Sequence, residues 1–130
     1  MARKITLNQR PADFKRKVEI PMLDGGEVAE VEFHFKYRTR TEHAKLIDEH
    51  AELVKKKADV RQDGDFSFER FVGQSLEDDA DMIVQMATGW DLDDAFNKEN
   101  VVELLNMYGG SGQNITAAYR AAIVEGRLGN

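Results

Sequence analysis

Three histidines are the first residues to test for catalysis or metal binding, because imidazole serves both as a general base and as a metal ligand. They are His34, His43 and His50. A metal site on one helix places its histidines four residues apart, as in His-Glu-x-x-His, whereas His43 and His50 are seven apart. The chain has no cysteine, so thiolate ligands for zinc are also missing. We interpret the histidines as solvated or interfacial side chains and expect no metal ion or other cofactor.

Acidic and glycine-rich segments also fall short of known chemical motifs. Asp91 and Asp93 open like a calcium-binding loop, but Phe96 occupies the sixth position, where the EF-hand needs glycine. The run that begins at Asp63 lacks glycine at the same position. Residues 109–112 are rich in glycine but lack the Gly-Lys-Ser/Thr ending of a phosphate-binding loop. No serine lies in a Gly-x-Ser-x-Gly elbow. We therefore expect no catalytic residues and no enzymatic activity.

A set of methionines and large aromatic rings suits protein binding better than catalysis. Methionine adapts to irregular partners, and aromatic rings anchor protein interfaces. Met82 and Met86 lie beside the apolar stripe of their predicted helix rather than at its centre, which favours a surface groove. The alternative is that the rings, Trp90 and Tyr108 above all, belong to the core. The candidate partner-binding residues are Met82, Met86, Trp90, Phe96, Met107 and Tyr108.

Length and charge restrict the class of protein. A chain of 130 residues is expected to form a single domain over residues 1–130. No apolar run approaches the roughly 20 residues that span a bilayer, and the basic start lacks the apolar segment of a signal peptide, so we expect a cytoplasmic protein. The net charge of −6 argues against nucleic acid as the main ligand. Residues 1–13 are interpreted as a mobile basic arm, with an acidic partner or nucleic acid as the alternative reading of its charge.

The elements that must position these residues follow from hydrophobic periodicity. Apolar side chains alternate up to Met22 and again from Ala29 to Tyr37, which predicts a β-hairpin over residues 14–38. Asp24 and Gly25 supply residues that suit a hairpin turn. Residues 39–130 show helical spacing instead. The predicted fold class is α+β, with an N-terminal antiparallel β-hairpin packed against about four α-helices.

Capping residues predict where the helices start. Thr39 and Glu42 have the spacing of a capping box. A second helix is expected from about residue 67 to residue 88, with a break near Gly73 left open. Asn97 and Asn114 are predicted to cap the third and fourth helices. The predicted buried stripe of the first helix is Ala44, Ile47, Ala51, Val54 and Ala58, widened by Leu46 and Leu53.

Several segments, in a fixed order and spacing, resemble one protein family. They are residues 33–42, 89–91, 96–108, 115–119 and the terminal 126–130. Together they resemble the tail assembly chaperones of long-tailed bacteriophages and their prophages, from about Phe14 onward. Gly109 and Gly110 depart from the pattern, because a proline-containing turn is expected at that point.

The resemblance implies a chaperone without enzymatic activity that binds the tape-measure protein, keeps it soluble and helps recruit tail-tube subunits. It also implies a longer, frameshifted form that engages the tail-tube protein, a location in the cytoplasm of the bacterial host, and absence from the mature virion. Such a role needs adaptable apolar grooves and a charged exterior. Two alternatives stay open: a small nucleic-acid-binding phage regulator that uses the basic arm and the lysines at 55–57, and a minor structural virion protein. Self-association also stays open.

Overall fold

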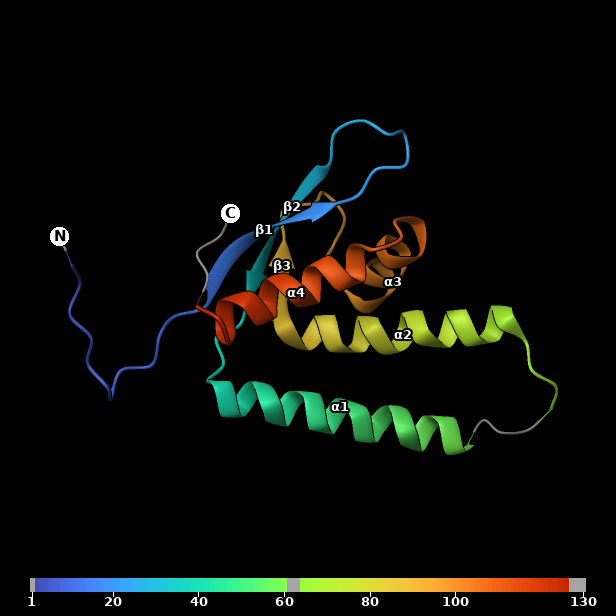
Figure 1. The fold of residues 1–130 in the computed structure, drawn as a ribbon, viewed down its shortest axis with the longest axis horizontal. Helices are drawn as coiled ribbons and strands as arrows, with labels where there is room; N and C mark the ends of the chain where they lie inside the picture. The colour runs from blue at the N-terminus through green and yellow to red at the C-terminus, as the bar shows by residue number, and fades with distance from the viewer. Residues whose placement is uncertain (1, 61–63, 127–130) are drawn as a thin grey trace.

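The structure is a computed structural model, and it describes residues 2–60 and 64–126. The elements in these ranges are β1 (Phe14–Ile20), β2 (Ala29–Phe35), α1 (Arg40–Val60), α2 (Phe68–Met86), β3 (Ala87–Trp90), α3 (Lys98–Met107) and α4 (Ser111–Ile123). The predicted α+β class is confirmed, since an N-terminal antiparallel hairpin packs against the helices (Figure 1). Residues 61–63 of the predicted loop and residues 127–130 of the terminal motif lie outside the described ranges.

The hairpin forms as its alternating pattern predicts. β1 and β2 pair antiparallel, with Phe14 opposite Phe35 and Ile20 opposite Ala29. Gly25 in the connecting loop has a φ of 75°, a conformation that glycine adopts without a steric penalty. The inward-facing side chains of both strands belong to the core. They are Val18, Ile20, Val31, Phe33 and Phe35.

A third strand, β3, replaces the end of the helix predicted up to residue 88. α2 ends at Met86, and the chain then pairs with β2, placing Phe33 opposite Trp90 and Phe35 opposite Ala87. Ala87 and Trp90 fit both structures. Their spacing of three continues the apolar stripe of a helix, and they are also the two buried end residues of this short strand. Pairing also covers an edge of β2 that would otherwise carry unsatisfied backbone groups. The sheet order is therefore β1-β2-β3.

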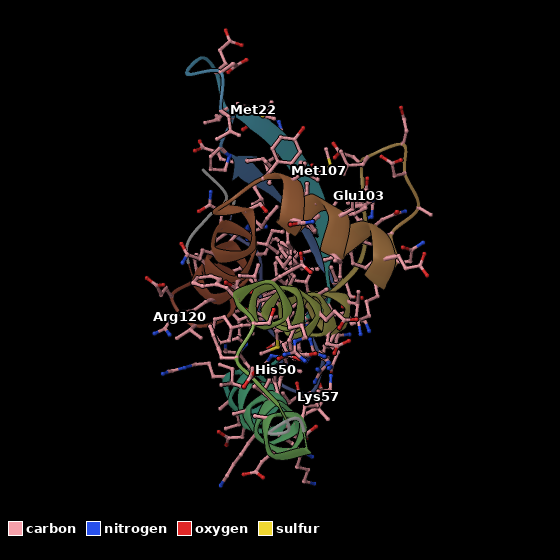
Figure 2. All side chains as sticks on the ribbon, turned by 90° about the vertical axis from the view of Figure 1, so that its right-hand side faces the viewer. Met22, His50, Lys57, Glu103, Met107 and Arg120 are labelled. Carbon is pink, nitrogen blue, oxygen red and sulfur yellow. The ribbon has the colours of Figure 1, made fainter. Side chains whose placement is uncertain are left out.

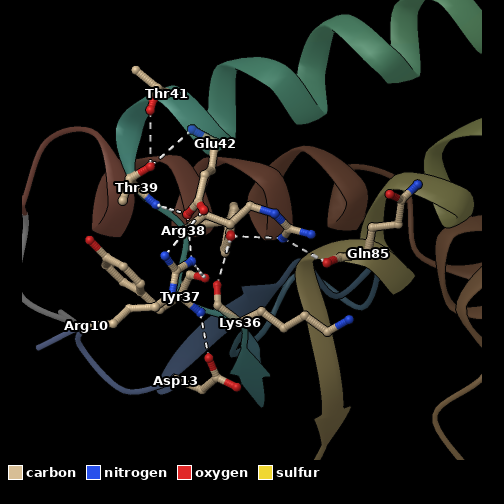
Figure 3. Close-up of polar contacts among 10 residues, drawn as sticks. Arg10, Asp13, Lys36, Tyr37, Arg38, Thr39, Thr41, Glu42 and Gln85 are labelled. Atoms are coloured by element: carbon tan, nitrogen blue, oxygen red, sulfur yellow. Dashed lines mark hydrogen bonds and ion pairs between the residues drawn. The ribbon is translucent and has the colours of Figure 1, made fainter.

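Two predicted helix caps are confirmed. At the start of α1, the Glu42 N–H donates to the Thr39 hydroxyl at 3.2 Å, and the Thr39 N–H donates to the Glu42 carboxylate at 2.9 Å (Figure 3). At the start of α3, the Asn97 side-chain oxygen accepts from the Asn100 N–H at 2.8 Å. Each pair satisfies backbone donors that have no partner inside the helix.

The start of α2 was predicted correctly, whereas that of α4 was not. α2 begins after Ser67, whose hydroxyl accepts from the Arg70 N–H, and it continues through Gly73 without a break. α4 begins earlier than predicted, after Gly110, which has a φ of 87°. The prediction that Asn114 caps α4 is therefore wrong. Its side-chain amide instead donates to the Glu19 carbonyl at 2.9 Å and ties α4 to the edge strand.

α1 lies along α2, on the side away from the sheet (Figure 1). The predicted buried stripe of α1 is wrong, because Ala44, Ala51 and Ala58 are exposed and Ile47 is 42% exposed. Among the described side chains of α1, His43 and Leu46 are buried; Leu46 was expected on the widened stripe, whereas His43 was not. The face of α1 that meets α2 carries polar residues. Apolar periodicity alone assigns such residues to solvent, so it does not predict this buried face.

Candidate functional site

Two openings lie at opposite ends of the molecule, and the labelled side chains in Figure 2 mark them. Met22, Glu103 and Met107 lie near one another, beside the hairpin and α3. His50 and Lys57 lie at the other end, where α1 faces α2. The first opening, between the hairpin and α3, is called the hairpin groove below, and the second, between α1 and α2, is called the helix cleft.

The hairpin groove encloses about 330 Å³ and is mostly apolar. Its floor includes Ile20 and Val31, which are 2% and 4% exposed. Its rim is accessible, because Met107 is 57% exposed. The groove is lined by Ile20, Met22, Val31, Trp90, Leu104, Met107 and Tyr108, with Asp94 and Glu103 as acidic members of its lining.

Trp90 presents an apolar ring to the hairpin groove because its polar atom is satisfied elsewhere. The indole N–H donates to the Asp94 carbonyl at 2.7 Å. Phe96 packs edge-on against the indole, with ring centroids 5.1 Å apart, and Phe33 does so at 5.9 Å. The indole is thus held between aromatic rings, which fixes one wall of the groove.

The six candidate partner-binding residues divide into two groups. Trp90, Met107 and Tyr108 line the hairpin groove, and Phe96 packs against Trp90. Met82 and Met86 are in the core, 9% and 2% exposed, so the expectation that they line a surface groove is wrong. α2 packs against α3, α4 and β3, and its buried face is therefore wider than the single stripe from which those methionines were judged.

Sequence reasoning missed a cluster of three phenylalanines beside the helix cleft. Phe66, Phe68 and Phe71 are 75%, 70% and 61% exposed, and their ring centroids lie 6.1–6.3 Å from one another. A signal was present, since all three fall within six residues and none belongs to the apolar stripe predicted for this helix, which is Val72, Leu76, Ala80, Ile83, Ala87 and Trp90. Exposed apolar patches of this kind mark interaction surfaces more often than single exposed residues do.

The helix cleft encloses about 800 Å³ and combines apolar walls with acidic side chains. Val54 and Ala58 of α1 face Phe66 and Phe71 across it. Its aspartates are Asp65, Asp78 and Asp79. Burial raises the pKa of Asp79, and the neighbouring Asp78 carboxylate raises it further, against an opposing effect of His50. The Asp78 carboxylate is already paired with Lys57 at 3.6 Å, so an arriving cation would meet mainly Asp65 and Asp79.

Lys57 is held by acidic side chains and not presented to solvent with its neighbours. Its ammonium lies 3.0 Å from the Asp81 carboxylate and 3.6 Å from that of Asp78. The hydrogen bond to Asp81 raises the pKa of Lys57, although partial desolvation opposes the shift. The lysine run at 55–57 therefore offers an external ligand fewer free cations than its sequence indicates.

Within the described residues, no three histidine, cysteine or acidic side chains are placed to hold a metal ion together. The helices in those ranges include none with the length and apolar character needed to cross a membrane. What the surface offers instead is two apolar openings with acidic side chains in their walls.

The sequence was compared with models of known protein families. A family model described as phage tail assembly chaperone matches residues 1–130. The chain belongs to the phage tail assembly chaperone family. No curated protein and no solved structure matches it. The resemblance seen in the sequence is confirmed, and the chaperone's apolar grooves are the features to test for contact with tail proteins.

Proposed function

We propose that this chaperone binds the tape-measure protein and holds an amphipathic helix of it in the hairpin groove. The observation that carries the proposal is an accessible groove built from methionine and aromatic side chains, with Met107 at its rim. An amphipathic helix docks in such a groove through apolar residues spaced three and four apart. Methionine side chains accept several different helices, because they are flexible and polarisable.

Acidic side chains in the groove lining favour a particular client surface. Asp94 and Glu103 flank the apolar lining. A helix that carries lysine or arginine beside its apolar stripe would pair with them, and like charges would be repelled. The groove is small for a stable protein interface, so we expect moderate affinity per site and release when tail-tube subunits compete.

The proposal extends to the later steps of assembly. The chaperone keeps the tape-measure protein soluble in the host cytoplasm, helps tail-tube subunits assemble around it, and is absent from the mature virion. A longer, frameshifted form is the proposed contact to the tail-tube protein. The family description supports a role in tail assembly, and the individual steps rest on the resemblance of the segments described above.

Co-expression with the tape-measure protein encoded nearby tests the proposal. We expect the client to become soluble and to co-purify with the chaperone. Met107→Asp places a charge in the groove and removes apolar contact worth about 1.5–3 kcal/mol, so binding should weaken about tenfold or more. Asn106→Asp is the matched control, because it adds the same charge on the neighbouring exposed residue, outside the groove lining.

Two results would contradict this assignment. The client role is wrong if the tape-measure protein stays insoluble and never co-purifies with the unaltered chaperone. The hairpin groove is the wrong site if the client binds, and both substitutions leave the amount of co-purified client unchanged.

A further inference from the structure

The N-terminal arm, residues 2–9, projects away from the domain (Figure 1). It carries two large apolar side chains in solvent, since Ile5 and Leu7 are 87% and 98% exposed. Exposed apolar residues this close together suit a partner that covers them, and a turn closed by the Gln9 N–H and the Thr6 carbonyl bends the arm at Leu7. Arg3 and Lys4 precede them, so the segment combines positive charge with apolar character.

The arm leaves the domain from a fixed point at the start of α1. The Arg10 guanidinium lies 2.6 Å from the Glu42 carboxylate and 5.0 Å from the Tyr37 ring centroid. Asp13 accepts a hydrogen bond from the Tyr37 N–H at 2.8 Å. Figure 3 shows these contacts together at the first turn of α1. Residues 10–13 are therefore docked on the domain, and the projecting arm consists of residues 2–9, which precede them.

The helix cleft has the complementary properties. Three aspartates line it, of which Asp78 already lies 3.6 Å from the Lys57 ammonium, and the basic side chains of the lining are His50 and Arg70. Phe66 and Phe71 provide exposed apolar surface beside these acids. Its volume, about 800 Å³, lies within the roughly 300–1,000 Å³ of sites that enclose a ligand. A short segment with two bases followed by two exposed apolar residues complements the cleft in charge and in apolar character.

The arm is too short to reach the far part of the helix cleft of its own chain. Glu42, where Arg10 is bound, lies about 24 Å along the α1 axis from Ala58 in the cleft, at a rise of about 1.5 Å per residue. Leu7 lies three residues before Arg10, so it reaches only about 10 Å even when the chain is fully extended. The arm therefore cannot place Leu7 against Phe66 and Phe71 of its own chain.

We propose that the arm of one copy docks in the helix cleft of a second copy, and that the exchange is reciprocal. Ile5 and Leu7 pack on Phe66 and Phe71, and the bases at the start of the arm face the cleft aspartates. A two-fold dimer follows, because the same arm and the same cleft are used twice. The hairpin groove lies at the other end of the molecule (Figure 2), so this dimer forms whether or not a client is bound there.

Directed cross-linking tests the exchange, and the absence of native cysteine makes the background clean. Leu7→Cys and Ser75→Cys are made on separate copies, mixed and mildly oxidised. Ser75 lines the cleft, and the substitution is nearly isosteric. We expect a mixed disulfide dimer to form at least fivefold faster than with Ala117→Cys, the control on the exposed face of α4. Equal rates for the two partners would overturn the proposal.

Sedimentation of the full chain gives an independent reading. The double substitution Ile5→Asp and Leu7→Asp should raise the dimer dissociation constant at least tenfold. Thr6→Asp with Asn8→Asp adds the same two charges to the arm without removing apolar side chains, so it should have a smaller effect. A monomer at every concentration, or a dimer that neither pair changes, would overturn the proposal. The proposal would also be overturned if a tape-measure fragment formed a cross-link with the Ser75→Cys variant and the arm of a second copy formed none.

Discussion

At the scale of single residues, His43 is buried without full hydrogen bonding. It is 6% exposed, its Nδ1 atom has no partner, and its ring lies 5.5 Å from that of Tyr119. Burial lowers its pKa below the ordinary value of 6.5, and the positive charges of Arg120 and Arg38 lower it further. The folded state therefore favours neutral His43, while the unfolded state accepts the proton more readily.

This histidine should make stability depend on pH just below neutrality. A lowered folded-state pKa contributes stability that is fully present above pH 6.5 and is lost as pH falls below it. We expect the melting temperature to fall between pH 7 and pH 5.5, a range above the ordinary pKa values of carboxylates. His43→Leu should flatten that dependence and raise stability by about 1 kcal/mol, because it removes the unpaired Nδ1 atom.

Ala44→Leu is the matched control for this thermal measurement. It adds the same side chain at the neighbouring, exposed position of α1, so it should keep the pH dependence of the unaltered chain. An unaltered chain whose melting temperature is constant from pH 7 to pH 5.5 would contradict this account of His43.

At the scale of elements, the Asp81 carboxylate joins three helices. It lies in α2 and is 3.0 Å from Lys57 of α1 and 3.0 Å from Lys98 of α3. Burial alone would raise the pKa of Asp81, but the hydrogen bonds from Lys98 and Lys57 lower it overall. The stability it contributes is therefore present at neutral pH and is lost as pH falls through the lowered pKa.

Removal of this carboxylate should loosen α1 more than any other helix. Asp81→Ala leaves Lys57 with only the longer contact to Asp78, and we expect a loss of about 1 kcal/mol in the free energy of unfolding. Hydrogen exchange should accelerate in the C-terminal half of α1 and remain slow in β2. Asp48→Ala, at an exposed position of α1, is the control. Unchanged exchange in α1 of the Asp81→Ala variant would show that α1 is held by other contacts.

Some of the helices and strands could be predicted from the sequence, and others could not. The hairpin and the caps at Thr39 and Asn97 were predictable, because alternation and capping are local properties. β3 was not, because Ala87 and Trp90 suit a helical stripe and a short strand equally well, and pairing with β2 decided between them. On α1, Leu46 was expected on the buried face, whereas His43 was missed because apolar spacing does not select a histidine.

At the scale of the whole molecule, the hairpin groove arises between segments that are distant in the chain, whereas the helix cleft lies between two consecutive helices. Met22 of the hairpin loop and Met107 of α3 line one groove, although the sequence pattern gives no reason to pair them. Three of the six candidate residues, Trp90, Met107 and Tyr108, line this groove, and their contact with a partner stays a prediction. Met82 and Met86 were misplaced because the width of the buried face of α2 depends on tertiary packing.

The central claim is that the hairpin groove receives a helix of the tape-measure protein. Methionine methyl NMR of the full chain, titrated with fragments of that protein, tests it most directly, because methionines sit both in the groove and in the core. If a helix of the client occupies the groove, the signals of Met22 and Met107 should shift on binding, while those of the buried Met82 and Met86 should change little. Binding that leaves Met22 and Met107 unmoved would contradict it.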